Sequence, residues 1–346
     1  MNLLRPLPLL ALACALVAGD AAPVRIFMYS EYIDPALAAT FKAKTGFALD
    51  VQVYEAQEEM IAKLQTGGTD QYDVLVASGV VVKQMIALKL VQPLDQTLIT
   101  NKGNVTPALL NQAFDPGNQY SYPYFWGTTG LMYDTAKVKG EPTWAWVFDP
   151  AQQPGSVLLL DEAKTCLASA LVWQGKSMNS RVSAEVKAAA EALVKAKSSP
   201  KSLGFAGGVD GKNKVVGGEA VVAMVYNGDA ARGIADTKDR KLAYAIPKEG
   251  GEIWLDLLLV SAKAPNKAGA HALINFLLDA EAAAQNANFI KYASPIEAAK
   301  PKILPELLQN PVIYPSPEVM KRLVFLEDLG KDTRMWDAAW TAVKSE

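Results

Sequence analysis

The chain alternates strand-like and helix-like segments along most of its length. The apolar runs "VRIFMY" (24–29), "ALDVQVYEA" (48–56) and "YDVLVAS" (72–78) are typical of strands, and a segment with helical periodicity follows each of them. The pattern returns in "GSVLLLDEAKTCLASALVW" (155–173), "GEAVVAMVYNGDAAR" (218–232), "EGGEIWLDLLLVS" (249–261) and a single long helix, "NKAGAHALINFLLDAEAAAQNA" (266–287). This alternation predicts an α/β fold with parallel strands joined by helical crossovers, and ligands of such folds bind beyond the carboxyl ends of the strands.

Length and charge narrow the class of protein. With 346 residues, half of them hydrophobic, the chain is long enough for roughly two domains. Its net charge of −2 and the lack of a dominant basic stretch argue against a nucleic-acid surface. The single histidine, His271, lies in the apolar run "GAHALINFLL", which favours a helix face over a catalytic or metal-binding role. Serine–histidine–aspartate catalysis and multi-histidine metal sites are excluded, and no cofactor is predicted.

The first 22 residues are typical of a secretory signal peptide. A positive flank precedes "LPLLALACALVAG" (7–19), which is too short to span a membrane, and small residues follow as a cleavage site. Alternatively, Cys14 marks a lipoprotein site, although Ala11 stands where leucine is expected. We therefore expect a periplasmic protein, either soluble or tethered by a lipid. Cleavage would leave Cys166 as the only cysteine, a buried and inert thiol.

Aromatic and acidic residues recur at strand ends and turns. The stretches concerned are Tyr29-Ser30-Glu31-Tyr32, Asp161-Glu162, Tyr226-Asn227-Gly228-Asp229 and Trp254-Leu255-Asp256. A primary ammonium requires a carboxylate partner when it is buried, and it also interacts favourably with aromatic faces. If these stretches converge, they would form a site for an amine.

Each stretch also has a purely structural interpretation. Glu31 could be a solvated charge in a turn, and Asp161, Glu162 and Asp229 could cap helices. Trp254 could be an ordinary core residue. Asp256 is the hardest to dismiss because it interrupts the apolar strand "IWLDLLLV", where it either points to solvent or faces a cleft.

A series of collinear motifs resembles one family. The motifs are "YSEYI" (29–33), "YDVLVAS" (72–78), "FDPGNQYSYPYFWGTTGLMYD" (114–134), "IPKEGGEIWLDLLLV" (246–260), "ALINFLLD" (272–279), "YASPIEAAK" (292–300) and "RMWDAAWTAVKSE" (334–346). In this order they resemble the periplasmic spermidine- and putrescine-binding proteins of ABC importers. The last motif looks closest to the putrescine-binding branch.

The resemblance implies a type II periplasmic-binding-protein fold. Two α/β lobes, each a mixed, mainly parallel sheet flanked by helices, would close by a hinge on a ligand in the interlobe cleft. Residues 1–22 would be the signal peptide. Lobe 1 would comprise 23–126 and about 249–296, and lobe 2 about 127–248 and about 297–346.

The resemblance also implies a ligand-binding site. The matching positions are Tyr29, Ser30, Glu31, Tyr32, Ser78, Glu162, Tyr226, Asp229, Trp254, Asp256 and Tyr292. Glu31 and Asp256 are the expected partners of the ligand's ammonium groups. Asp229 matches the putrescine branch, and Glu162 matches an acid of the spermidine branch.

The chain departs from the family pattern at several positions. Thr165 stands where the family has a further acid beside the middle of the ligand, Val80 where an aromatic residue is common, and Leu326 where a glutamine aligns. Tyr29 and Tyr226 stand where tryptophans are usual. A central ammonium would lack its partner at Thr165, so the sequence favours putrescine over spermidine.

The leading functional hypothesis is a monomeric, non-enzymatic binding protein that delivers a polyamine to a membrane ABC permease. Three alternatives remain open. The specificity could have diverged to an ω-amino acid or another cationic metabolite, with Arg232 near the site as a carboxylate partner. Glu31 and Asp256 could form the carboxylate pair of a hydrolase. The bound polyamine could also be presented to a membrane receptor.

Overall fold

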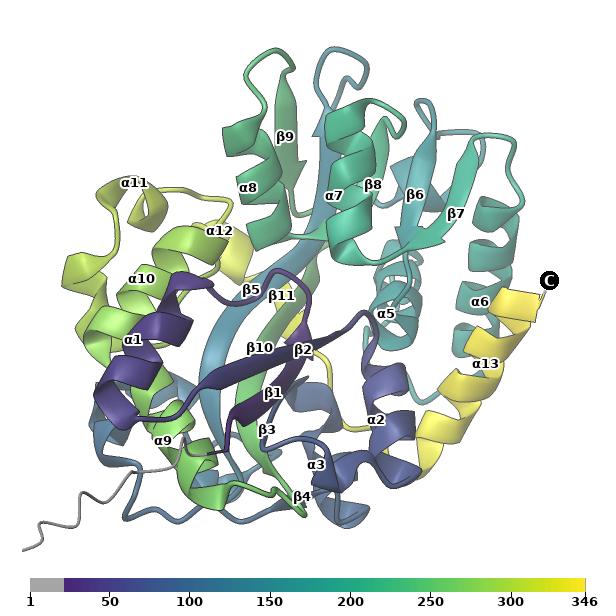
Figure 1. The fold of residues 1–346 in the computed structure, drawn as a ribbon. Coiled ribbons are helices and arrows are strands. Elements are labelled where there is room, and N and C mark those ends of the chain that lie inside the picture. Colours follow the sequence, from purple (N-terminus) through teal and green to yellow (C-terminus); the bar gives the residue numbers. More distant parts are fainter. Residues whose placement is uncertain (1–21, 346) are drawn as a thin grey trace, which may run out of the picture.

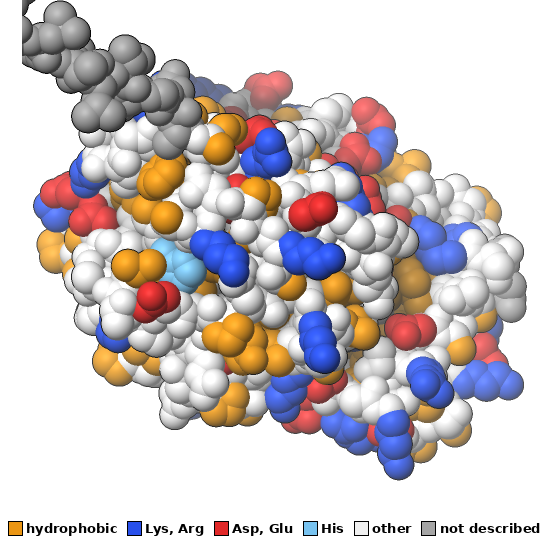
Figure 2. All heavy atoms as spheres, turned by 60° about the horizontal axis from the view of Figure 1, so that its bottom comes forward, with side chains coloured by type: hydrophobic (Ala, Val, Ile, Leu, Met, Phe, Trp, Pro, Cys, Tyr) orange, Lys and Arg blue, Asp and Glu red, His pale blue; other side chains and the backbone are white. Residues whose placement is uncertain are grey.

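The computed structural model describes residues 22–345. The predicted signal peptide, with Cys14, lies outside the described residues except for Ala22. Within the described part, no helix is both long enough and apolar enough to cross a membrane. Figure 2 shows one face on which basic and acidic side chains are interspersed, so this face has no extended area of one charge.

The first half of the molecule is a sheet built largely from N-terminal strands. Its strand order is β2 (Leu49–Tyr54), β1 (Val24–Tyr29), β3 (Val74–Ser78), β10 (Gly251–Ser261) and β5 (Ser121–Asp134). The first three strands are parallel, whereas β10 runs antiparallel to both β3 and β5. The helices of this half are α1 (Ala36–Thr45), α2 (Gln57–Gln65), α3 (Gly79–Ala87), α9 (Lys267–Leu277) and α10 (Ala280–Ile290).

The second half has its own strands and helices. The strands are β6 (Val157–Leu160), β7 (Ser202–Ala206), β8 (Val222–Tyr226) and β9 (Leu242–Ala245). The helices are α4 (Ala145–Phe148), α5 (Ala163–Trp173), α6 (Ser183–Lys197), α7 (Gly208–Gly217), α8 (Asn227–Asp236) and α13 (Thr333–Ser345). Strand β6 lies parallel to β7 and β8, so this sheet also has a parallel centre.

One long strand, β5, joins the two halves (Figure 1). Its first part pairs with β10, and its last part pairs with β8 and β9. Smaller elements complete the fold: β4 (Val91–Gln92), α11 (Pro305–Leu308), α12 (Pro317–Met320), β11 (Leu323–Phe325), and 3₁₀ helices at Gly68–Asp70, Thr100–Asn104, Pro107–Leu109, Pro116–Asn118, Glu297–Lys302 and Gly330–Asp332. The strands that alternate with helices in the sequence therefore bring their carboxyl ends to the region between the halves.

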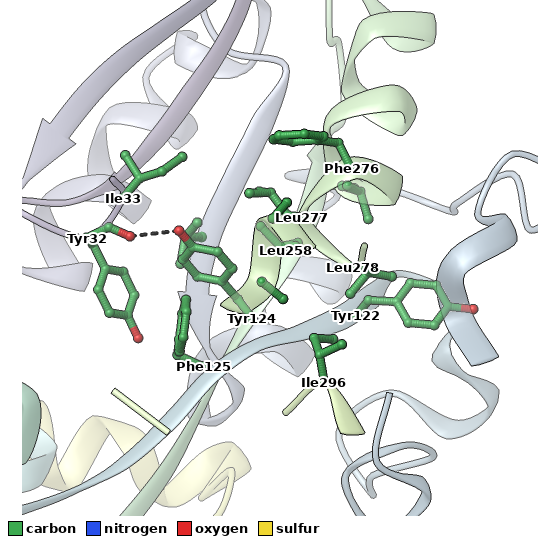
Figure 3. Packing of buried hydrophobic residues seen from close by; sticks show 14 of the residues in the cluster. Tyr32, Ile33, Tyr122, Tyr124, Phe125, Leu258, Phe276, Leu277, Leu278 and Ile296 are labelled. Atoms are coloured by element: carbon green, nitrogen blue, oxygen red, sulfur yellow. Dashed lines mark hydrogen bonds between the residues drawn. The ribbon is translucent and has the colours of Figure 1, made fainter. Parts of the chain in front are cut away.

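Each half has an apolar core. The core of the first half includes residues of β1, β3, β10, α9 and α10, and Figure 3 shows part of it around Tyr124, Leu258 and Phe276. The core of the second half contains Cys166, which is fully buried as predicted, and burial raises the pKa of its thiol far above the usual range. His271 is also structural, because its Nε2 accepts a hydrogen bond from the backbone of Asp95 at 2.9 Å.

Two expectations from the sequence were wrong in detail. The long helix expected at 266–287 is two helices, α9 and α10, and the side chain of Asp279 accepts hydrogen bonds from the first backbone N–H groups of α10. The segment after residue 296 also does not join the second half at once, because Ala299, Ile303, Leu307 and Ile313 pack in the first core. The chain returns to the second half near Leu326 and Leu329, which pack in or against the second core, and α13 then packs against α5 and α6.

Candidate ligand-binding cleft

A cavity lies between the two halves, at the ends of β1, β3, β6 and β8. Ten of the eleven predicted positions line it: Tyr29, Ser30, Tyr32, Ser78, Glu162, Tyr226, Asp229, Trp254, Asp256 and Tyr292. Ten further residues line the cavity, among them the two departures from the family pattern at Val80 and Thr165: Glu55, Gln57, Glu58, Val80, Val81, Lys164, Thr165, Gly208, Val209 and Glu252. Segments far apart in the sequence therefore converge on one site.

Aromatic rings form a continuous series along the cavity. The ring centroids of Tyr29 and Tyr32 are 6.0 Å apart, and those of Tyr32 and Tyr292 are 5.4 Å apart. The series continues from Tyr292 to Trp254 at 5.3 Å and from Trp254 to Tyr226 at 5.8 Å. All four contacts are edge-to-face, the arrangement that the ring quadrupoles favour. The cavity thus offers aromatic surface for the methylene groups of a ligand and ring faces for a cation.

Asp256 is a buried acid within this aromatic wall. Its Oδ2 accepts a hydrogen bond from the hydroxyl of Tyr32 at 2.7 Å, and its exposed fraction is 5%. The hydroxyl of Tyr124 holds Tyr32 in turn, by donating to the Tyr32 backbone oxygen at 2.7 Å (Figure 3). Burial raises the pKa of Asp256 to about 7, against the lowering effect of the Tyr32 hydrogen bond. Asp256 therefore faces the cleft and not solvent.

Asp229 lies in the first turn of α8 and faces the same cavity. It is not the N-cap, since Tyr226 occupies that position, and its carboxylate is hydrogen-bonded to the side chain of Tyr292. Burial raises the pKa of Asp229 to about 6, although Lys212 opposes the shift. The glycine before it is required, because a Cβ at Gly228 would lie 2.5 Å from the ring of Tyr292.

Glu162 occupies the N-cap position of α5, but its side chain does not cap the helix. Its Oε1 accepts a weak hydrogen bond from Gln57 at 3.4 Å, and its Oε2 is buried without a hydrogen-bond partner. Burial, followed by the charge of Glu58, raises the pKa of Glu162 well above its usual range. Its neighbour Asp161 instead contacts Lys344 at 2.8 Å and does not line the cavity.

Glu252 is a cavity acid that the sequence reasoning missed. It lies on β10 with an exposed fraction of 4% and accepts a hydrogen bond from the hydroxyl of Thr129 at 3.0 Å. Burial raises the pKa of Glu252 to about 7, whereas hydrogen bonds from Thr165 and Thr129 lower it. A signal was present in the sequence, because residues two apart on a strand share a face. Glu252, Trp254 and Asp256 follow that spacing.

Glu31 is the one predicted site residue that does not line the cavity. It occupies a turn after β1 with a left-handed backbone (φ 53°), and nearly half of its side-chain surface is exposed. Its carboxylate pairs with Lys212 of α7, at 3.1 Å, and with Arg232 of α8. Glu31 thus forms a salt bridge between the two halves, and its charge already has basic partners.

Acidic side chains outnumber basic ones in the lining of the cavity. Six carboxyl groups line it, from Glu55, Glu58, Glu162, Asp229, Glu252 and Asp256, and one lysine, Lys164. Burial lowers the pKa of Lys164 and raises those of the lining tyrosines, so the tyrosines are neutral at physiological pH. Within residues 22–345, no three acidic, histidine or cysteine side chains are grouped to hold a metal ion. Dispersed acids between aromatic rings suit an elongated polycation.

A profile of the family described as bacterial extracellular solute-binding protein matches residues 36–313, well over half of the chain. The chain belongs to this family. The match spans both halves of the fold and the elements that line the cavity.

Individual relatives of this solute-binding protein cover nearly its whole length. The spermidine/putrescine-binding periplasmic protein of Escherichia coli (strain K12) is 34% identical over 330 residues, which are 95% of this chain and 93% of the relative. The putrescine-binding periplasmic protein SpuD of Pseudomonas aeruginosa is 30% identical over 346 residues, with coverage of 95% and 93%.

Solved structures agree with this relationship. A structure from Listeria monocytogenes assigned to a spermidine/putrescine ABC transporter has a TM-score of 0.85 at 31% identity, covering 93% of this chain and 98% of that one. The spermidine/putrescine substrate-binding protein of Streptococcus pneumoniae has a TM-score of 0.76 at 29% identity, covering 94% and 99%. The two-lobed α/β fold predicted for this solute-binding protein is thereby confirmed, as is the family resemblance.

Proposed function

We propose that this solute-binding protein captures a linear polyamine in the interlobe cavity and delivers it to the membrane permease of an ABC importer. Asp256 carries the proposal. It is a carboxylate nearly excluded from water, held by a tyrosine hydroxyl and surrounded by aromatic rings. Among residues 22–345, no lysine or arginine forms a salt bridge with Asp256, and the hydrogen-bond donor to its carboxylate is the neutral hydroxyl of Tyr32. The spermidine/putrescine-binding relatives support the same class of ligand.

We infer from the geometry how a polyamine would lie in the cavity. One terminal ammonium would pair with Asp256, and the methylene groups would pass along Trp254 and Tyr292. A second ammonium would pair with Asp229 or with the unpartnered Oε2 of Glu162. Each ring face near a desolvated ammonium would add about 0.5–2 kcal/mol.

Putrescine, with two ammonium groups, would use Asp256 and one of these two further acids. The sequence favoured it over spermidine because Thr165 replaces a family acid. In the cavity, however, the hydroxyl of Thr165 is hydrogen-bonded to Glu252, so a carboxyl group lies directly beside the altered position. The length of the ligand therefore depends on the role of Glu252.

The residues that supported two alternative functions, a hydrolase and an ω-amino acid binding protein, make other contacts in the structure. A carboxylate-pair hydrolase would use Glu31 with Asp256, but Glu31 lies outside the cavity and is paired with Lys212 and Arg232. An ω-amino acid would use Arg232, which is bound to Glu31. Lys164 lines the cavity and is the remaining candidate for a ligand carboxylate, so competition between 4-aminobutyrate and putrescine is the discriminating measurement.

The direct test is calorimetry of the mature protein with putrescine, cadaverine, spermidine and spermine. Asp256→Asn keeps an acceptor for the hydroxyl of Tyr32 but removes the charge. We expect it to weaken every polyamine that binds by about 100-fold, or roughly 3 kcal/mol, because breaking a buried charge pair leaves the ammonium uncompensated. Wild-type protein that binds none of the four amines, or full affinity in Asp256→Asn, would contradict the proposal.

A further inference from the structure

Glu252 is a buried acid whose hydrogen-bond partners are all neutral. Its Oε2 accepts from Thr129 at 3.0 Å, and Thr165 is its other side-chain hydrogen-bond partner. No lysine or arginine of the described chain forms a salt bridge with it, whereas Glu31 and Asp134 each have a basic partner. A carboxylate buried without a cation is costly unless a cation arrives from outside. Glu252 is therefore arranged to receive a cation from a ligand.

The spacing along β10 sets how far apart two such cations must be. Glu252 and Asp256 share one strand face, with Trp254 between them, and all three line the cavity. Four residues at about 3.3 Å each place their Cα atoms roughly 13 Å apart. An extended chain advances about 1.2 Å per bond, so putrescine spans about 6 Å between its nitrogens and spermidine about 11 Å between its terminal nitrogens. With a hydrogen bond of about 2.8 Å at each end, the triamine joins carboxyl oxygens about 17 Å apart and the diamine joins oxygens about 12 Å apart. The triamine therefore spans the separation of the two Cα atoms, and the diamine falls just short of it.

Thr165 stands where the family resemblance implies an acid, and the carboxyl group of Glu252 lies beside it in the structure. Thr165 lies in the first turn of α5 and hydrogen-bonds to Glu252, which comes from β10 in the other half. The negative charge that the sequence seemed to lack is thus supplied from the facing strand. The threonine hydroxyl positions this carboxyl group.

Space continues beyond Glu252. A second cavity adjoins the first and shares Ser78, Val80, Glu252 and Trp254 with it. Val80 belongs to the lining that both cavities share, and it stands where the resemblance implies an aromatic side chain. Glu252 thus lies at a junction and not at a closed end.

We propose that Glu252 provides the countercharge for the third ammonium of a linear triamine, with Asp256 holding the opposite end. The inference rests on the proposed polyamine function and names its ligand class as triamines of spermidine length. It also makes Glu252 a specificity-determining residue of the cavity.

The test compares putrescine and spermidine by calorimetry in wild type, Glu252→Gln and Asp256→Asn. Glutamine retains the oxygen that accepts from Thr129, and equal melting temperatures would verify folding. We expect Glu252→Gln to lower the ratio of spermidine to putrescine affinity by ~10- to 100-fold, the range for losing one charged hydrogen bond. Asp256→Asn should weaken both ligands and leave that ratio within about threefold, because both ligands use it.

A rescue variant separates the charge of Glu252 from a structural role. Glu252→Gln combined with Thr165→Glu moves the carboxyl group back to α5 and should recover most of the spermidine affinity. An unchanged spermidine-to-putrescine ratio in Glu252→Gln, or no recovery in the double variant, would overturn the inference. Wild-type protein that binds neither amine would instead refute the proposed function itself.

Discussion

Lowering the pH should weaken polyamine binding by an amount that the cavity acids determine. The carboxyl groups of Asp256 and Glu252 each have a pKa of about 7 in the ligand-free protein, because burial disfavours their charged forms. A ligand ammonium requires the ionised form, and the ligand's own amines, with pKa values near that of lysine at about 10, stay charged throughout. Binding should therefore release protons near neutral pH.

The expected loss of affinity depends on how far the pH lies below the pKa of each acid. At about pH 8 both acids are largely ionised, whereas about pH 5.5 lies about 1.5 pH units below the pKa of each. Ionising one acid at the lower pH costs about 2 kcal/mol, which weakens the affinity roughly 30-fold. Putrescine, which uses Asp256 but not Glu252, should lose at least on the order of 30-fold, because the pKa of the acid that holds its second ammonium, Asp229 or Glu162, is also raised. Spermidine, which uses Glu252 as well, should lose roughly 30-fold more than putrescine over the same range.

Calorimetry in buffers of different ionisation enthalpy measures both the affinity and the protons released. Asp256→Asn serves as the control, and it should release fewer protons and show a shallower pH dependence. Affinities that stay constant over this pH range, with heats independent of the buffer, would refute the assignment of buried, proton-binding carboxyl groups to the site.

The same acids predict the pH dependence of stability in the empty protein. Their folded-state pKa values of about 7 lie above the ordinary values for free carboxyl groups, near 4. The stability they contribute is fully present below pH ~4 and is lost as the pH rises through about 7. Differential scanning calorimetry should show a melting temperature that falls over this window without ligand, and saturating spermidine should remove much of the fall.

Two further predictions concern packing and closure. Gly127→Ala would place a Cβ 2.5 Å from Trp254 and closer still to Asn227. We therefore expect the free energy of unfolding to fall by about 1–3 kcal/mol and ligand binding to weaken. Gly103→Ala is the control in thermal unfolding, because a Cβ there has nothing within 4 Å. Glu31→Gln should weaken the salt bridge between the halves by about 1 kcal/mol and raise the ligand dissociation rate roughly fivefold in stopped-flow fluorescence, since the pair is partly exposed. An unaltered dissociation rate would argue against a closing role for Glu31.

Much of the architecture could be predicted because the spacing of apolar residues along the chain reflects the local secondary structure. The strands β1, β2 and β3 and the helices between them follow directly from apolar runs and helical spacing, and Gly46 ends α1 with the left-handed backbone that glycine allows. Helix boundaries were less predictable where a capping residue lies inside a sequence that resembles one continuous helix. Asp279 divides one apparent helix into two, since a helical hydrophobic pattern does not reveal a change of axis.

The sequence by itself determined that aromatic and acidic residues would gather at strand ends, because the apolar runs and the alternation of strands with helices fix which residues lie there. Only the tertiary structure decided which acids line the cavity. The orientation of Glu31 depends on one left-handed residue in a turn and on Lys212 and Arg232, some 181 and 201 positions away. Glu252 enters the cavity because Thr165, from the opposite half, meets it there. Contacts across the cleft therefore place Glu31 at the junction between the halves and Glu252 in the wall of the cavity.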